Sequence, residues 1–258
     1  MVLGLWETIL VALIGIIGCG LGFLVYIKNP KKRANQLFTF LTFSFLIWII
    51  SAFLSEIPKN LNYSLFLSKI AYLGVLLSAV FLFYFSFYFP RTKILKKGIS
   101  YSIIVLGIVL AVLNISSDLI IKGIVPTSWG FTLVFGSLYP GYLMFCIIPT
   151  LWALINFFRS LKKVSYIEKL QLKYLLLGLI IFIGTSIIVN VVIRAIVGSD
   201  IYYRIGNYSG IFFIVFSAAA ITKYHLFGIR VLLTELLVGV MGIVLLIFGL
   251  VGPSLSAK

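Results

Sequence analysis

The chain has few of the residues that build metal centres, disulfide frameworks or catalytic sites. Its 258 residues include one histidine, two cysteines and six acidic residues, and only 10% are charged. The single histidine, His225, cannot supply two ligands, which excludes a bis-histidine haem or a two-histidine metal site. Cys19 and Cys146 each lie inside an apolar run without metal-ligand spacing. This placement favours two buried small side chains over a disulfide or a metal site.

Catalytic motifs are missing from the sequence as well. It contains no serine–histidine–acid set, no glycine-rich phosphate loop and no carboxylate dyad in a suitable context. A retinal-binding protein needs a lysine midway along a late helix, whereas Lys223 is expected at the cytoplasmic end of the seventh apolar run. The sequence therefore predicts a protein without enzyme activity and without a cofactor.

Apolar sequence, by contrast, is abundant. Hydrophobic residues make up 62% of the chain and the mean hydropathy is +1.20, whereas a soluble domain is nearer half apolar. A helix needs about twenty residues to cross a bilayer core, and it satisfies its own backbone polar groups in hydrocarbon. We predict an all-α fold, a polytopic transmembrane helix bundle of seven to eight spans in the plasma membrane. The spans are expected at residues 5–27, 37–55, 67–89, 99–115, 138–158, 172–196, 206–223 and 236–252.

Lysine and arginine gather in alternate loops. Fifteen basic residues lie in or beside the loops after the first, third, fifth and seventh spans, against three in the loops between them. Cytoplasmic loops carry such an excess, so we predict that the amino terminus lies outside the cell. The net charge of +15 then indicates anionic membrane lipids as partners rather than nucleic acid. Because this charge follows the first span, that span is expected to be an uncleaved helix rather than a signal peptide.

The longest polar interruption, residues 116–137, is expected on the outer face. Two apolar stretches, 119–121 and 131–135, flank a turn-rich segment at 126–130. Branched and aromatic runs around a turn predict a β-hairpin, so we expect a small extracellular β-hairpin lid over the bundle.

A shallow outward pocket is the candidate ligand site. Ionisable residues within spans often mark function because charge is expensive to bury in lipid. We select Arg194 and Lys69 at the outer rim, and Trp129 in the lid, as candidate ligand-binding residues. In that pocket the two cations are expected to meet an anionic group or to pair with Glu7 or Glu56. The alternative is that both cations only extend to the membrane interface and form ion pairs there.

Five segments of the chain resemble the seven-transmembrane amino-terminal region of bacterial sensor histidine kinases. They are GFLVYIKNPKKRANQLF at 22–38, FYFSFYFP at 83–90, GSLYPGY at 136–142, QLKYLLLG at 171–178 and AITKYHLFGI at 220–229. Each is degenerate, and their order and placement carry the resemblance. It implies a module that senses a signal at or outside the membrane and biases the catalytic state of an attached kinase.

We accordingly interpret residues 1–230 as a seven-helix transmembrane sensor region, and 231–258 as an eighth helix with a short tail. The resemblance implies a possible homodimer and a histidine kinase module, in cis or in trans, as partners. His225 is followed by Leu226 without the acidic residue and proline expected around a phosphoacceptor histidine, and no ATP-binding motif follows. The chain is then part of a longer reading frame, a truncated form or a stand-alone sensor, and we favour a longer reading frame with a ninth span. A small membrane permease or channel subunit is the alternative, and it predicts a continuous polar pathway across the bilayer.

Overall fold

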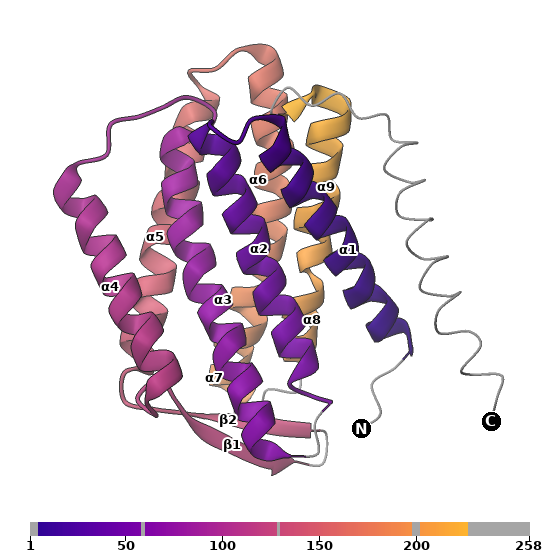
Figure 1. The fold of residues 1–258 in the computed structure, drawn as a ribbon, viewed down its shortest axis with the longest axis vertical. Helices are drawn as coiled ribbons and strands as arrows, with labels where there is room; N and C mark the ends of the chain where they lie inside the picture. Colours follow the sequence, from indigo (N-terminus) through magenta and orange to yellow (C-terminus); the bar gives the residue numbers. More distant parts are fainter. Residues whose placement is uncertain (1–4, 58–59, 128–129, 198–201, 227–258) are drawn as a thin grey trace.

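The computed structural model describes residues 5–57, 60–127, 130–197 and 202–226, which form a helical bundle (Figure 1). Within these residues, seven helical segments are long and apolar enough to cross a membrane. Four of them are α1 (Leu5–Lys28), α2 (Arg33–Leu54), α3 (Leu61–Tyr88) and α4 (Lys97–Ser116). The others are α5 (Tyr139–Leu161), α6 (Tyr166–Ile187) continued by a π-helix η1 (Ile188–Ile193) and α7 (Arg194–Val197), and α8 (Tyr203–Tyr208) followed by α9 (Gly210–Tyr224). The helical fold class predicted from the sequence is confirmed.

Several helices extend beyond the apolar runs that predicted them. The third and sixth spans each begin six residues earlier than expected, because polar caps start them in the interface rather than in hydrocarbon. The Asn60 side chain accepts a hydrogen bond from the Asn62 backbone N–H at the start of α3. Ser165 and Glu168 form a capping box at the start of α6. The predicted eighth span, 236–252, lies outside the described residues.

Two glycines let neighbouring helices approach closely. A Cβ atom at Gly74 in α3 would lie 2.5 Å from the backbone nitrogen of Trp48 in α2. A Cβ atom at Gly178 in α6 would lie 3.0 Å from the Phe213 Cα in α9. Small residues at such contacts allow backbone-to-backbone packing, which holds helices together in lipid. The pairs α2–α3 and α6–α9 are therefore the closely packed parts of the bundle.

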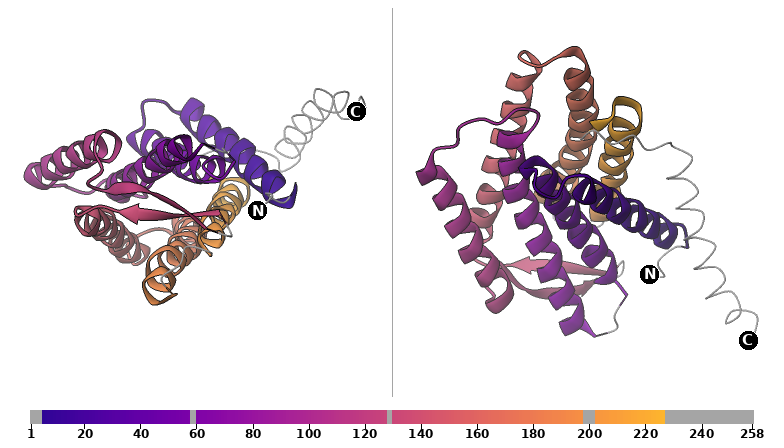
Figure 2. Two further views of the ribbon diagram at one scale, coloured as in Figure 1. Left: turned by 90° about the horizontal axis from the view of Figure 1, so that it is seen from below. Right: turned by 45° about the horizontal axis from the view of Figure 1, so that its top comes forward.

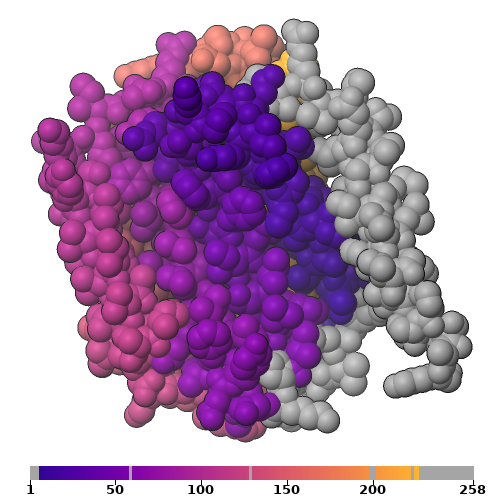
Figure 3. Space-filling model, in the orientation of Figure 1, coloured from indigo at the N-terminus to yellow at the C-terminus, as the bar shows by residue number. Residues whose placement is uncertain are grey.

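Aromatic side chains join these two pairs at the centre. Phe45 of α2 makes edge contacts with Phe182 of α6 and Phe213 of α9, with ring centroids 4.8 and 4.9 Å apart. Phe85 of α3 packs against Phe157 of α5 at 5.7 Å. Helix α4 packs on α3 and lies at the side of the bundle, as the ribbon and the space-filling view of the same face show (Figures 1 and 3). Most of α4 is exposed, so it offers its apolar surface to lipid.

A β-hairpin crosses one end of the bundle (Figure 2). It consists of β1 (Ile121–Thr127) and β2 (Gly130–Phe135), paired antiparallel with Ile124 opposite Leu133. The predicted hairpin is confirmed, but the first strand lies later than the expected 119–121. Ile120 and Ile121 are fully buried in a cluster with Leu76, so the start of β1 and the residue before it anchor the hairpin to the bundle.

The two ends of the bundle differ in charge. The loops α1–α2, α3–α4 and α5–α6 all lie at the end opposite the hairpin (Figure 1), and they carry the basic clusters found in the sequence. We call these the basic end and the hairpin end. Helix α9 also ends at the basic end, where His225 adopts a left-handed conformation and its backbone N–H bonds the Ala220 carbonyl. The single histidine therefore terminates a helix.

Candidate functional site

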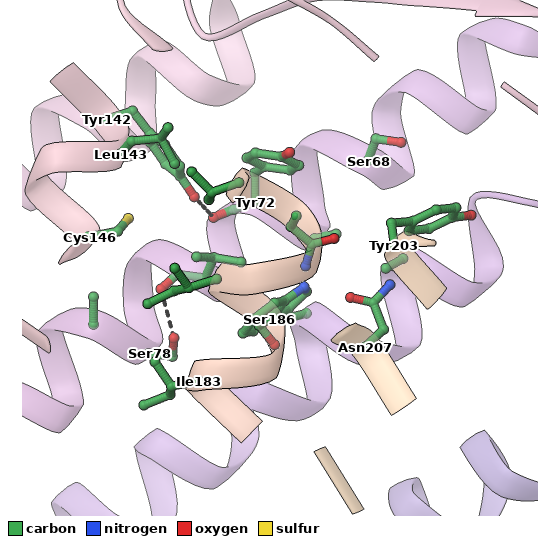
Figure 4. Close-up of a pocket in the computed structure, with 18 of the residues that line it drawn as sticks. Ser68, Tyr72, Ser78, Tyr142, Leu143, Cys146, Ile183, Ser186, Tyr203 and Asn207 are labelled. Carbon is green, nitrogen blue, oxygen red and sulfur yellow. Dashed lines mark hydrogen bonds between the residues drawn. The ribbon is translucent and has the colours of Figure 1, made fainter. Parts of the chain in front are cut away.

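A pocket with a volume of about 170 Å³ lies between α2, α3, α5, the sixth span and α8. Phe131 and Leu133 of β2 contribute to its lining, so the pocket extends to the hairpin end of the bundle. The close-up shows side chains from α3, α5, α6 and α8 around one space (Figure 4). Within the described part of the chain, this is the cavity that joins the hairpin to the spans.

The walls are mostly aromatic and aliphatic. Trp48 lies at one side and stacks on Phe182, with the ring centroids 5.1 Å apart. Tyr142 lies at the other side, fully buried, and its hydroxyl donates to the Tyr72 carbonyl at 2.6 Å. That bond joins α5 to α3 and satisfies the one polar atom of a buried ring. The result is a rigid, apolar wall.

The π-helix η1 places one polar side chain in this apolar surround. Its sequence is IVNVVI, and Asn190 from it lines the pocket. Gly206 of α8 makes room for that amide, since a Cβ atom there would lie 2.7 Å from Asn190 Nδ2. Ser186 Oγ donates to the Gly206 carbonyl at 3.1 Å, which links the sixth span to α8. Single π-helical turns inside α-helices are frequent at functional sites.

Arg194 connects the sixth span to the hairpin. It lines the pocket, and its Nη2 donates to the Leu133 carbonyl of β2 at 2.7 Å. Its guanidinium carbon lies 4.0 Å from the centroid of the Phe135 ring, a cation–π contact. Phe135 in turn stacks on Tyr139 at the start of α5. Arg194 thus fastens the hairpin over the pocket, from the residue that follows the π-helix.

The other two residues selected from the sequence are not placed with Arg194. Lys69 does not line the pocket: its Nζ donates to the Ser117 carbonyl at 2.8 Å and pairs with Asp118 at 3.2 Å. Asn114 Nδ2 donates to the Lys69 carbonyl at 2.7 Å, so this cluster joins α3 to the end of α4. Trp129 lies outside the described residues, and its role stays a prediction.

The buried carboxylates Glu7 and Glu56 share one cation. Arg204 of α8 pairs with Glu7 of α1 at 3.0 Å and with Glu56 after α2. Both carboxylates have Arg204 as a partner because α8 brings it between α1 and α2, whereas Lys69 pairs with Asp118. Burial raises the pKa of the Glu56 carboxyl above its ordinary value, although Arg204 and Tyr203 act to lower it. The three charges tie together segments almost two hundred residues apart.

A second polar cluster lies at the basic end. Lys93 Nζ donates to the Ser86 carbonyl of α3 at 3.1 Å and to the Asn156 carbonyl of α5 at 3.0 Å. Burial, and then the charges of Lys163 and Arg159, lower the pKa of the Lys93 ammonium. Lys93 therefore holds the end of α3 to α5 by supplying donors to two helix carbonyls.

An ion pair joins the third and sixth spans at the same end. Arg91, in the loop after α3, pairs with Glu168 of the α6 capping box at 3.2 Å. The sixth span is thus joined to the hairpin at one end, through Arg194, and to the α3–α4 loop at the other.

Sequence reasoning found part of this site. Arg194 was selected from its position near the end of a span. Asn190 was not selected, although it is a polar residue deep in an apolar run. Tyr203 and Asn207, which also line the pocket, were missed. Their signal was an interruption of the seventh apolar run by RIGNYS at 204–209, which precedes the start of α9.

Comparison of the sequence with known protein families gives one match. The sequence profile for the N-terminal 7TM region of histidine kinase matches residues 10–230. No curated protein matches the chain, and no solved structure does. The matched region is the non-catalytic sensor part of such kinases, and no kinase domain was found in this chain. The match covers most of the chain and includes at least part of each of the seven described spans, so the chain belongs to the family of N-terminal seven-transmembrane regions of histidine kinases.

Proposed function

We propose that this chain is the membrane-embedded sensory input domain of a two-component signal-transduction protein, and that it is non-catalytic by itself. The observation that carries this proposal is a pocket whose walls come from five spans and from the hairpin, in a chain of the histidine kinase sensor family. A site shared by so many elements can respond to occupancy with a change in helix packing.

The mechanism we propose is a population shift between two packings of the bundle. A ligand or membrane state that favours one packing shifts the equilibrium by its differential affinity. The sixth span is the transmitting element, because Arg194 attaches its hairpin end to β2 and Glu168 attaches its basic end to Arg91. Small helix shifts of about 1–2 Å are a common form of such transitions.

We propose Arg194 as a residue of the sensing site, since it lines the pocket and holds the hairpin. For Lys69, a role in ligand binding requires its ammonium to leave Ser117 and Asp118. We therefore assign Lys69 to the joint between α3 and α4 first. Trp129 remains a proposal from the sequence alone.

The proposed partners are membrane lipids, a histidine kinase module in cis or in trans, and a second copy of the chain. The exposed apolar faces of α1 and α4 are open to lipid or to a second copy. The proposed orientation places the basic end in the cytoplasm, where a kinase module would receive the signal. The basic clusters there support it, because lysine and arginine are retained on the cytoplasmic side.

A fusion protein tests the sensory function. Residues 1–230 are joined to the phosphoacceptor and ATP-binding domains of a histidine kinase, and autophosphorylation is measured in membranes. Ala71 of α3 is buried and lines the pocket, so Ala71→Leu should alter the packing and change the rate severalfold. The matched control, Val105→Leu on the exposed face of α4, should leave the rate unchanged.

Equal rates for the two variants, with both proteins folded, would contradict the proposal. Saturable uptake of a solute by liposomes that contain the chain would favour the permease alternative.

The orientation has its own test. In a Cys19→Ser background, single cysteines replace Lys32, Lys96 or Lys162 of the basic end, or Lys122 of β1. A membrane-impermeant maleimide applied to intact cells should label only the cysteine at position 122. Labelling at the basic end instead would reverse the proposed topology.

A further inference from the structure

The size and the lining of the pocket indicate which kind of molecule it binds. This inference rests on the proposed sensory function. We infer that the pocket binds an uncharged molecule about the size of one aromatic ring, with one group that both donates and accepts hydrogen bonds. Primary amides and alcohols on a ring are members of this class.

The size follows from the cavity. Its volume is about 170 Å³, and an engineered apolar cavity of about 150 Å³ binds benzene. The walls favour a flat apolar body, because Trp48, Phe45 and Tyr139 all contribute rings to the lining. Aromatic walls of this kind bury a ring through edge and offset contacts.

The polar group follows from two asparagines. Asn207 of α8 is only 5% exposed, and its amide lines the pocket together with that of Asn190. Among the described residues, neither side-chain amide has a hydrogen-bond partner, whereas the pocket residues Ser186 and Tyr142 are bonded to backbone carbonyls. Asn190 is half-buried, and neither amide belongs to the fully enclosed polar atoms that lack a partner, so a molecule in the pocket can reach both. A ligand that bonds them supplies the hydrogen bonds that the protein does not. Each amide offers both a carbonyl and an N–H₂ group, so the complementary ligand both donates and accepts.

We expect the ligand to be uncharged because of the other residues that line the pocket. No acidic side chain occurs among the described residues that line the pocket, so nothing there favours an ammonium group. The one cationic side chain, Arg194, lies toward the hairpin with its guanidinium on Leu133 and Phe135. A carboxylate beside the two neutral amides would lose its hydration, and the Arg194 guanidinium is already held by the Leu133 carbonyl and the Phe135 ring.

Quenching of Trp48 fluorescence measures binding directly. The other three tryptophans are replaced by phenylalanine, and the chain is placed in lipid nanodiscs. The probe is 4-bromobenzamide, whose bromine quenches a tryptophan that it touches. Partition into lipid gives quenching that rises linearly with concentration, whereas the site gives a saturable component. Benzamide, toluene and benzoate then compete as a neutral polar, an apolar and an anionic ring of similar shape.

We expect saturable quenching, with benzamide competing about tenfold better than toluene or benzoate, the effect of one or two hydrogen bonds. Asn207→Leu and Asn190→Leu should each weaken the saturable component about tenfold. Asn62→Leu, the same change at an exposed position of α3, should not. Ala79→Leu, which fills the pocket from α3, should abolish it. If one asparagine variant does not fold, the other asparagine variant and Ala79→Leu still test whether saturable quenching is lost.

Three results would overturn the inference: no saturable quenching in the monodisperse parent protein, toluene or benzoate competing as well as benzamide, or no loss in the folded asparagine variants. None of them bears on kinase control, which the fusion protein measures separately. Conversely, if substitutions in the pocket leave the autophosphorylation rate of the fusion protein unchanged, the sensory function is contradicted. That result does not contradict the binding site.

Discussion

Removal of the Arg204 guanidinium should destabilise the bundle strongly and in a pH-dependent way. The side chain links Glu7 of α1 and Glu56 after α2, and the three side chains are 18, 7 and 8% exposed in that order. Arg204→Met keeps the length and apolar stem of the side chain but leaves two buried carboxylates without their cation. Breaking a buried pair by removing one partner typically costs about 3–5 kcal/mol.

Protonation sets an upper limit on this loss. A carboxylate that cannot be paired can take up a proton, which costs about 3.7 kcal/mol for a glutamate at pH 7 and about 1 kcal/mol at pH 5. The loss in Arg204→Met should therefore be about 3–5 kcal/mol at pH 7. At pH 5 the loss should be smaller, because burial raises the pKa of the Glu56 carboxyl, which then takes up a proton at little cost.

Unfolding by sodium dodecyl sulfate in mixed micelles, followed by tryptophan fluorescence, measures the free energy at both pH values. The control is the triple variant Glu7→Gln, Glu56→Gln, Arg204→Met, in which no charge remains to be neutralised. It should recover most of the stability at pH 7. A loss that is independent of pH, or a triple variant as unstable as the single one, would refute the reasoning and assign the effect to lost packing.

Three further predictions follow from the same contacts. Gly74→Ala should cost about 1–3 kcal/mol, because its Cβ would clash with the α2 backbone, and a normal unfolding curve would argue against the close α2–α3 packing. The stability of the parent protein should fall as the pH rises from 4.5 through the raised pKa of Glu56, since the folded state holds that proton more tightly. Glu56→Gln should flatten this slope, and an unchanged slope would assign it to another group. Arg194→Gln should speed hydrogen exchange in β1 and β2 by about 10- to 100-fold, through loss of the bond to Leu133 and the contact with Phe135; unchanged exchange would mean that other contacts hold the hairpin.

The sequence by itself determined the class of the fold and the number and places of the described spans. Long apolar runs have one economical structure in a bilayer, because a helix satisfies its own backbone there. The hairpin was also predictable, because its two strands are rich in β-branched and aromatic residues and flank a turn. The ends of the third and sixth spans were not, because Asn60 and Ser165 extend these helices through caps that hydropathy does not register.

The site was only partly predictable from the sequence. Arg194 could be selected as a charge near the end of a span, but its bond to the hairpin joins segments 61 residues apart. Lys69 was selected by the same argument, and the structure instead pairs it with Asp118. The same argument, that a charged residue within a span marks function, thus selected two residues with different roles in the structure. It does not reveal which neighbour a charged side chain contacts.

Only the tertiary structure decided which helices share the pocket. All seven described spans are apolar, but hydropathy does not specify which of their faces meet around a common space. That choice depends on the close approach at Gly74 and Gly178, on the room that Gly206 leaves for Asn190, and on Arg204 lying between two distant glutamates. These are short-range contacts between residues far apart in the chain, and they exist only once the helices have packed.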